Sequence, residues 1–368
     1  MKKLLALVLA VAMVLSCACF AEAETMKVAM ITDYGDINDQ SFNQTTYEAC
    51  KAYCEANAIT FNYFKPAGDS TAERVAMIEA AIDEDYNVIV MPGYAFGAAI
   101  VETVDVYPEV LFIALDVSAG DLGDGYVVPA NLYCAVYQEE LCGYMAGFAA
   151  AKLGYKHLGF LGGMAVPAVV RYGYGFVQGV NAAAASNGIE GVTVEFVYGN
   201  QFYGDADITA YMDNWYKTLG VEVVFACGGG IYTSAAEAAA KVGGKVIGVD
   251  VDQVGIIDGA YGEGMTVTSA MKGLAPTVNT LLAAIKDGKF SEFGGKIDNL
   301  GLVSANPEDN YVQIPVASTQ FSDSFTVEDY TAMVGQMFAG EIVVSNDTTV
   351  SPVSFATAIT VNDCGMIK

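Results

Sequence analysis

The chain has 368 residues, a length that suggests two domains. Of these residues 54% are apolar and 16% are charged, so the chain can bury a large core. Asp and Glu number 43 against 17 Lys and Arg, and this net charge of −26 argues against a nucleic acid polymer or an anionic membrane surface as partner. The single histidine, His157, excludes catalysis or zinc binding that needs several histidines.

The first 23 residues are typical of a secretory signal segment. Two lysines precede an apolar run from Leu4 to Leu15, which is too short to span a bilayer, since a span takes about 20 residues. Two cleavage sites are open: Val14-Leu15-Ser16-Cys17 resembles a lipobox that ends in a lipidated Cys17, and Ala21-Glu22-Ala23 suits ordinary signal peptidase. Either way we expect the protein to work outside the cytoplasm, attached to the membrane only through a lipid on Cys17 if at all.

Eight cysteines occur, two of them within the signal segment. No Cys-x-x-Cys pair is present, so the spacing indicates neither a redox motif nor a zinc site. We expect the other six to be small buried apolar residues, with a disulfide framework as the alternative. These six are Cys50, Cys54, Cys134, Cys142, Cys227 and Cys364.

From Met26 onward, short β-branched runs alternate with helical stretches, which predicts parallel sheets covered by helices on both faces. The predicted strands are 27–31, 60–64, 88–91, 111–115, 157–161, 192–197, 221–226, 245–249 and 265–268. The predicted helices are 40–57, 70–83, 95–104, 166–186, 205–218, 233–241, 272–287 and 327–338. The fold class is therefore α/β with two doubly wound halves, and the tail from about 305 has no assigned role.

In such folds the ligand lies beside the carboxyl ends of the strands. The loop after the first strand places Asp33 there, and Phe42 and Asn43 follow at the start of a helix. A carboxylate can accept hydrogen bonds from sugar hydroxyls, and an aromatic ring can lie flat against a ligand. The alternative is that Asp39 or Ser41 caps the helix while Phe42 packs in the core.

Four later strands are followed by similar candidates. Asp116 follows the buried strand 111–115, and Asp250 ends the strand 245–249. Lys272 is predicted to begin a helix, where it could pair with Asp250 and orient it; the alternatives are turn aspartates and an exposed lysine. Gly228 opens a run of three glycines that would let the backbone approach a ligand closely.

Known catalytic motifs are not found. The G-x-G-x-x-G dinucleotide fingerprint is incomplete, and neither a phosphate-binding P-loop nor a G-x-S-x-G nucleophile elbow occurs. The many carboxylates show no spacing that singles out an acid/base pair. The sequence therefore gives weak support for an enzyme and predicts no cofactor and no metal.

Asp33 with Ile37-Asn38-Asp39-Gln40-Ser41-Phe42-Asn43-Gln44 resembles the signature of the basic membrane protein family. Its members are substrate-binding lipoproteins of ABC transporters, and the characterised members that this sequence is most similar to are purine nucleoside receptors. Further matching segments follow in family order over roughly residues 27–305: 112–116, 159–164, 173–176, 228–230, 247–253 and 268–272.

The resemblance implies a type I periplasmic-binding-protein fold, in which two doubly wound parallel-sheet lobes are joined by a hinge and enclose the ligand. The chain would cross between the lobes near residues 130, 268 and 297. The first lobe would then comprise 26–130 plus about 268–297, and the second lobe and tail 131–267 plus about 298–368.

The resemblance also implies roles for the residues that contact the base. Phe42 and Phe202 would sandwich a purine base, and Asp116 would read its edge. Stacking on an aromatic side chain is worth roughly 1–3 kcal/mol per base. Two such faces would supply much of the roughly 8 kcal/mol that submicromolar binding needs.

The remaining roles fall on five residues. Asp250 and Lys272 would bind the ribose hydroxyls, and Gly228 would allow close approach. Asp33 and Asn43 would lie beside the ligand on the first lobe.

The expected function is that of a monomeric receptor that captures a purine nucleoside and passes it to an ABC permease driven by an ATPase. One alternative is a receptor for a sugar or another small metabolite in the same fold. Two others are an extracellular nucleoside-processing enzyme and a sensor or antigen without transport.

Overall fold

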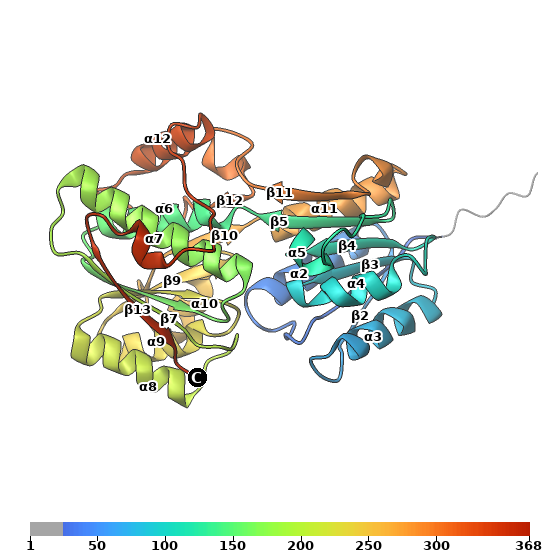
Figure 1. The fold of residues 1–368 in the computed structure, drawn as a ribbon, viewed down its shortest axis with the longest axis horizontal. Helices are drawn as coiled ribbons and strands as arrows, with labels where there is room; N and C mark the ends of the chain where they lie inside the picture. Colours follow the sequence, from blue (N-terminus) through green and yellow to red (C-terminus); the bar gives the residue numbers. More distant parts are fainter. Residues whose placement is uncertain (1–24) are drawn as a thin grey trace, which may run out of the picture.

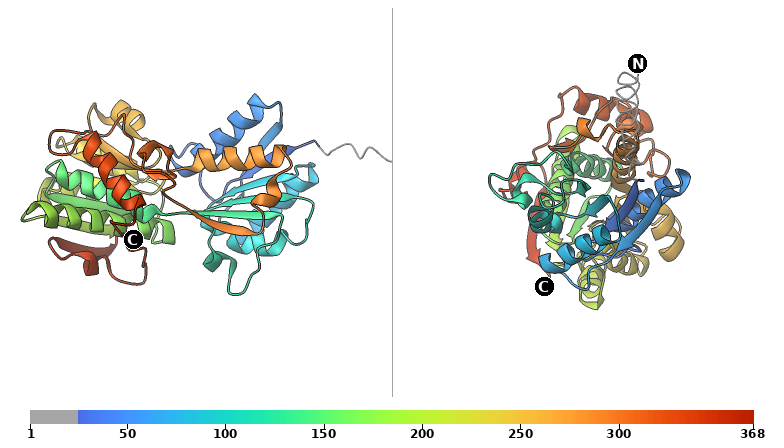
Figure 2. Two further views of the ribbon diagram at one scale, coloured as in Figure 1. Left: turned by 90° about the horizontal axis from the view of Figure 1, so that it is seen from above. Right: turned by 90° about the vertical axis from the view of Figure 1, so that its right-hand side faces the viewer.

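The computed structural model describes residues 25–368, so the predicted signal segment and Cys17 lie outside the described residues. Two sheets, each covered by helices, form two halves that lie side by side along the long axis (Figure 1). Seen from above, extended segments connect the halves (Figure 2). Within residues 25–368 no helix is both long and apolar enough to cross a bilayer.

The first half is built on a six-stranded, fully parallel sheet. Its strands in spatial order are β11 (Lys296–Leu300), β5 (Leu132–Tyr137), β4 (Leu111–Leu115), β3 (Val88–Pro92), β1 (Lys27–Ile31) and β2 (Thr60–Phe64). Its helices are α2 (Phe42–Ala56), α3 (Thr71–Asp83), α4 (Gly97–Thr103), α5 (Ala119–Leu122) and α11 (Leu274–Lys286). Helix α11 belongs here because it packs against α2.

The second half is built on a seven-stranded sheet that is parallel except for the pair β10 and β12. Its strands in spatial order are β12 (Val312–Gln313), β10 (Thr266–Lys272), β9 (Lys245–Asp250), β8 (Val223–Cys227), β6 (His157–Gly162), β7 (Thr193–Tyr198) and β13 (Thr360–Met366). Its helices are α6 (Glu139–Lys152), α7 (Pro167–Asn187), α8 (Ala206–Asn214), α9 (Tyr232–Ala240), α10 (Val254–Tyr261) and α12 (Val327–Phe338).

The central strands are continuous apolar runs because helices cover both faces of each sheet. Every residue of β3 and β8 is buried, whereas the edge strand β2 is mostly exposed. Helix starts follow local capping chemistry: Ser70 accepts a hydrogen bond from the Glu73 amide at the start of α3, and Asp205 caps α8. The prediction of an α/β fold with two doubly wound parallel sheets is confirmed.

The division of the chain into lobes stays a prediction. The strands end a few residues after the predicted crossing points near 130, 268 and 297. Strand β5 pairs with β4, so the chain leaves the first sheet after Tyr137 and not near 130. Strand β10 stays in the second sheet to Lys272, and β11 stays in the first sheet to Leu300. Each of these strands continues to the edge of its sheet that faces the other half. The chain passes to the other half only after the strand ends.

The sequence pattern missed β5 and α6, which follow each other directly. Helix α6 is buried on nearly all sides and therefore lacks the one-sided apolar periodicity that reveals a surface helix. Strands β11 and β13 were missed because they lack a buried apolar face: no residue of β11 is buried, and β13 is mostly exposed. Among the six described cysteines, all free, five are buried as predicted, and the prediction is wrong for Cys364, which is exposed on β13.

Candidate ligand-binding site

A cavity of about 800 Å³ lies between the two sheets, where the carboxyl ends of their strands face each other. This is the size of a small-molecule site. All eight residues predicted for the site line this one cavity: Asp33, Phe42, Asn43, Asp116, Phe202, Gly228, Asp250 and Lys272. The structure thus brings them together, while their individual roles toward a ligand stay predictions.

Asp33 is held rigidly at the end of β1. Its Oδ1 accepts hydrogen bonds from the backbone N–H groups of Tyr34 and Gly35, both at 2.6 Å. Burial raises the pKa of Asp33 to about 6, although these two hydrogen bonds lower it. The side chain is therefore a fixed acceptor on the cavity wall of the first half.

The start of helix α2 is capped by Asp39 and not by Ser41. The Asp39 carboxylate accepts hydrogen bonds from the amides of Asn43 at 2.9 Å and Gln44 at 3.0 Å. The capping alternative is thus correct for Asp39. Phe42 is half-buried, because one part of the ring packs against the core while the ring also lines the cavity.

Ser41 has a different task from capping. Its hydroxyl donates to Asp250 Oδ2 at 2.5 Å, and the two residues come from different halves of the molecule. Nearby, the Gln253 side-chain amide donates to the Gln40 carbonyl at 3.0 Å. These contacts connect the two halves directly, and Asp250 also lines the cavity.

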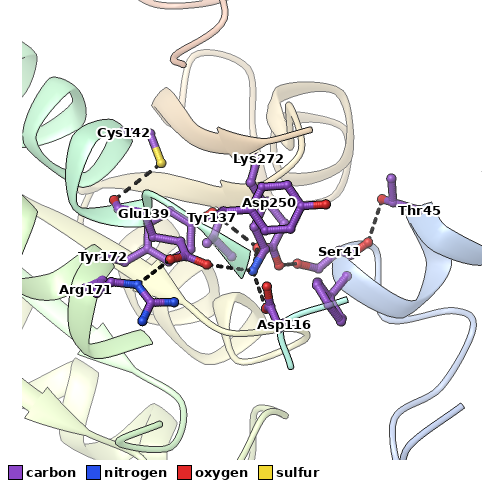
Figure 3. A network of polar contacts seen from close by, with 12 residues as sticks. Ser41, Thr45, Asp116, Tyr137, Glu139, Cys142, Arg171, Tyr172, Asp250 and Lys272 are labelled. Atoms are coloured by element: carbon purple, nitrogen blue, oxygen red, sulfur yellow. Dashed lines mark hydrogen bonds and ion pairs between the residues drawn. The ribbon is translucent and has the colours of Figure 1, made fainter. Parts of the chain in front are cut away.

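Lys272 ends β10 and does not begin a helix, which corrects the prediction. The ladder with β9 carries it to the cavity, where its side chain is 3% exposed. Its Nζ lies 2.5 Å from Asp116 Oδ2, 3.4 Å from Glu139 Oε1 and 3.8 Å from Asp250 Oδ1 (Figure 3). The predicted pair with Asp250 is present, but the shortest contact reaches across to Asp116 in the first half.

Three aromatic rings complete the surroundings of the Lys272 ammonium. It lies 4.7 Å from the ring centroid of Phe42, 5.4 Å from that of Tyr137 and 5.7 Å from that of Tyr172. Burial opposes its charge, yet the three carboxylates outweigh burial and raise the pKa of Lys272. Lys272 is thus charged and fixed at neutral pH.

Asp116 and Asp250 both end a strand in the left-handed backbone region, with φ of 60° and 66°. Aspartate tolerates this conformation better than most residues. The turn aims each carboxylate across the strand end toward Lys272. Burial raises the pKa of Asp116 to about 6; the Lys272 ammonium lowers it, and the nearby Glu139 and Asp250 carboxylates raise it further.

Sequence reasoning missed Glu139 and Arg171. Glu139 is fully buried, and one of its oxygens accepts from Arg171 Nε at 2.7 Å while the other faces Lys272 (Figure 3). Two adjacent glutamates, one residue after the apolar run 132–137, were the available signal for Glu139. Arg171 had none, because its partner lies on another helix.

Close packing of α6 against α7 sets the positions of these side chains. A Cβ at Gly143 would lie 2.2 Å from the Tyr172 carbonyl oxygen, and one at Gly175 would lie 2.1 Å from the Glu140 carbonyl oxygen. The two helices can approach this closely only because both positions are glycine. Glu139 and Arg171 are thereby brought within hydrogen-bond distance.

Phe202 lies on the opposite wall, in the loop between β7 and α8. A Cβ at Gly163 would lie 2.4 Å from its ring and one at Gly228 2.8 Å, so both glycines make the seat for this ring. Across the cavity, the Tyr34 and Phe202 rings are 6.3 Å apart and inclined by 27°. Tyr34, which the prediction omitted, is thus the ring found facing Phe202; the sandwich between Phe42 and Phe202 stays a prediction.

The cavity lining is acidic. Among the described residues that line it are seven aspartates but only two cationic side chains, Arg171 and Lys272. Both cations are engaged by carboxylates of the site. Such a lining repels phosphate groups and suits a neutral ligand that donates hydrogen bonds.

Two buried acceptors of the lining have no hydrogen-bond partner within the described chain. They are Asp116 Oδ1 and Asn43 Oδ1, both on the first half. A buried polar atom without a partner is costly, which makes it a natural contact for a ligand donor. The cavity therefore combines aromatic faces with acceptors that await N–H or O–H groups.

Comparison with known proteins gives a consistent result. Residues 26–329 match the family model described as "ABC transporter substrate-binding protein PnrA-like". The chain is 27% identical over 289 residues to the "ABC transporter nucleoside-binding protein BmpA" of Lactococcus lactis, covering 74% of this chain and 78% of that protein. It is 26% identical to "Basic membrane protein B" of Borreliella afzelii, covering 78% of this chain and 84% of that protein.

Among solved structures, an ABC transporter solute-binding protein from Aeropyrum pernix is similar to this fold with a TM-score of 0.66. The two share 21% identity, and the match covers 88% of each chain. This likeness concerns the fold, and it confirms the expected two-lobed periplasmic-binding-protein architecture.

Proposed function

Because the chain belongs to the family of PnrA-like ABC transporter substrate-binding proteins, also known as basic membrane proteins, we propose that its substrate is a purine nucleoside. Family membership makes it the substrate-binding component of an ABC transporter, which works with permease and ATPase subunits. The identity of the ligand is the step beyond that. The observation that carries it is a cavity in which aromatic faces lie beside the unpartnered carboxylate oxygen of Asp116.

The base would lie against the Phe202 ring, with Tyr34 and Phe42 on the other wall. A purine has a large π face that stacks on aromatic rings, at roughly 1–3 kcal/mol per base. Its N–H groups would donate to Asp116 Oδ1, which lies at the end of β4 and is buried. Base recognition thus uses one side chain for the edge and several rings for the face.

The sugar would lie over the Lys272 group. Asp250 and the Lys272 ammonium offer an acceptor and a donor side by side, 3.8 Å apart, which suits a pair of ribose hydroxyls. Asp33 and Asn43 add acceptors on the first half. A nucleotide would place its phosphate among the aspartates of the lining and is disfavoured by charge.

Capture would occur by closure of the two lobes over the ligand, outside the cytoplasm, with the protein as a monomer that is tethered through lipid on Cys17 or secreted. The ligand is bound and released without chemical change. Contacts between the lobes, such as Ser41 with Asp250, form in the closed arrangement. A permease can then distinguish the loaded receptor from the empty one by its shape.

Isothermal titration calorimetry tests this function. The protein is unfolded and refolded to remove carried-over ligand, then titrated with adenosine, guanosine, inosine, cytidine, uridine, adenine and ribose. We expect submicromolar dissociation constants for purine nucleosides, and weak binding of adenine or ribose alone. Tight binding of ribose without a preference for nucleosides would instead identify a sugar receptor, and the absence of heat with every compound would exclude the nucleoside proposal.

A further inference from the structure

Strand β13 lies along the outer edge of the seven-stranded sheet, beside β7 (Figure 1). The family model ends at residue 329, so this strand lies beyond the part of the chain that the family match covers. The pairing with β7 runs to Met366 opposite Tyr198, and the Ile367 amide donates to the Tyr198 carbonyl at 2.9 Å. The tail therefore follows β7 to its carboxyl end, which is the end beside the cavity.

The loop that carries Phe202 begins directly after β7. It spans residues 199–205, and Asp205 closes it by capping helix α8 through Oδ1. The Gln201 side-chain amide donates to the Tyr203 carbonyl at 2.8 Å and to Asp205 Oδ2 at 2.9 Å. Gln201 thus links the residues on either side of Phe202 within the loop.

Lys368 holds the same two residues from outside. Its ammonium donates to the Asp205 carboxylate and to Gln201 Oε1 at 3.3 Å, and lies 3.6 Å from Asp207 Oδ2. The neighbouring Ile367 packs against the apolar cluster under helix α8, which anchors the segment. Lys368 itself does not line the cavity.

The Phe202 ring has little room to move within its packing. Its ring rests on Gly163 and Gly228 so closely that a single methyl group at either glycine would collide with it. Its carbonyl accepts the Gly230 amide at 2.9 Å. A small displacement of the loop would therefore lift the ring off this seat and change the distance to Tyr34 across the cavity.

We propose that residues 360–368 form a clamp that holds loop 199–205, and through it Phe202, in the ligand-binding position, with Lys368 as a positioning residue. The proposal rests on the proposed function in that Phe202 is a ligand contact. It makes a segment outside the family match a determinant of ligand affinity. A ring that is held in place before binding loses less conformational freedom when the ligand arrives.

The test compares K368M with K368R and with K241M. Lys241 is a matched control, because it lies in the same half, is 35% exposed against 32% for Lys368, and also faces two carboxylates. Hydrogen exchange of the ligand-free protein is measured first. We expect K368M to speed exchange of the amides in 199–205 several-fold, K368R to restore most of the protection, and K241M to leave the loop unchanged.

Affinity for inosine is then measured for the same proteins and in an F202A background. We expect the dissociation constant of K368M to rise about threefold to fivefold, within the range that an exposed ion pair allows, and the effect to vanish when Phe202 is absent. Unchanged loop exchange in K368M, or an equal loss of affinity with and without Phe202, would overturn the clamp. If wild-type protein binds no nucleoside, the ligand proposal fails while the exchange data still decide the clamp.

Discussion

The Lys272 group shows how much of this site depends on single atoms. One ammonium serves three carboxylates from both halves of the molecule, and Arg171 supports Glu139 from behind. Three carboxylates against two cations leave one net negative charge in a buried place. The arrangement favours a ligand that donates hydrogen bonds. Asp116 combines two contacts, since one oxygen pairs with Lys272 and the other is left for a ligand donor.

Asp116→Asn should weaken nucleoside binding without abolishing the fold. The substitution keeps the shape but removes the charge-assisted acceptor for a base N–H, and hydrogen bonds to charged groups contribute about 1.5–3 kcal/mol. We expect the dissociation constant for inosine to rise about tenfold to a hundredfold by calorimetry, since about 1.4 kcal/mol is a factor of ten. The exposed Asp287→Asn is the control, and an unchanged affinity of D116N would show that Asp116 does not read the base.

Stability should depend on pH through Asp33. Burial raises its folded-state pKa to about 6 from the model-compound value of 3.8, so between these values the folded state holds a proton that the unfolded state has lost. The contribution of Asp33 to stability therefore falls as the pH rises from about 4 to 6, by something on the order of 1–3 kcal/mol, and stays level above. The free energy of unfolding is measured by urea titration at several pH values. Plotted against pH, the wild-type value should fall relative to that of Asp33→Asn over this window; parallel plots would contradict the raised pKa.

At the scale of single residues, a strand end in the sequence pattern marks two residues that the structure places in the cavity wall, Asp116 and Asp250, while their roles toward a ligand stay predictions. Sequence reasoning failed for Tyr34, Glu139 and Arg171, whose roles come from neighbours far along the chain. The Arg171–Glu139 pair depends on the close approach of α6 and α7. That approach is a property of packing and leaves no local pattern.

At the scale of helices and strands, glycines position the site residues as much as hydrophobic burial does, because they allow close contacts. Helices α6 and α7 meet at backbone contact distance, and Gly163 with Gly228 leaves room for the Phe202 ring. From the sequence, Gly228 is predicted to let the backbone approach a ligand closely. The structure adds a second reason, since any side chain there would collide with Phe202 before it met a ligand.

Gly163→Ala should displace Phe202 and weaken nucleoside binding by about tenfold or more, since overpacking of a tight contact typically costs about 1–3 kcal/mol. Gly163 is a better test than Gly228, because Gly228 has a positive φ that would strain an alanine and Gly163 does not. Gly255→Ala is the matched control, with open space around its new methyl group on helix α10. Equal inosine affinities for the two variants by calorimetry would mean that the seat of Phe202 does not matter for binding.

Element boundaries show the limit of pattern reasoning in another way. The predicted strand 265–268 stopped short of β10, which runs to Lys272, because Ala270 and Met271 have high helix propensity and end the β-branched run. The ladder with β9 continues to Met271 opposite Asp250, and tertiary pairing overrides the local signal. This one shift moves Lys272 from an exposed helix start to the centre of the site.

On the scale of the whole molecule, the structure shows the two halves in contact across the cavity. Ser41 with Asp250, Gln40 with Gln253 and Lys272 with Asp116 each join one half to the other. The α/β class and the two-sheet plan follow from the alternation of strands and helices in the sequence. The points of crossing do not, because β5 and β11 continue past the predicted boundaries to the facing edge.

Ser41→Ala should shift the lobes toward the open form, because it removes a hydrogen bond to the Asp250 carboxylate that joins the two halves. We expect about tenfold weaker binding of inosine. Small-angle scattering should show the ligand-driven contraction at correspondingly higher inosine concentration. Ser186→Ala, on the exposed end of α7, is the control. Wild-type affinity for S41A would show that this contact does not stabilise the closed form.

The central claim is that a purine nucleoside is held between the two lobes, and a crystal structure of the protein grown with inosine tests it most directly. We expect density for the whole nucleoside in the cavity, with the base against Phe202 and within hydrogen-bond distance of Asp116, and the ribose beside Asp250 and Lys272. Inosine density elsewhere, or the reverse orientation with the ribose at Asp116, would contradict this binding mode.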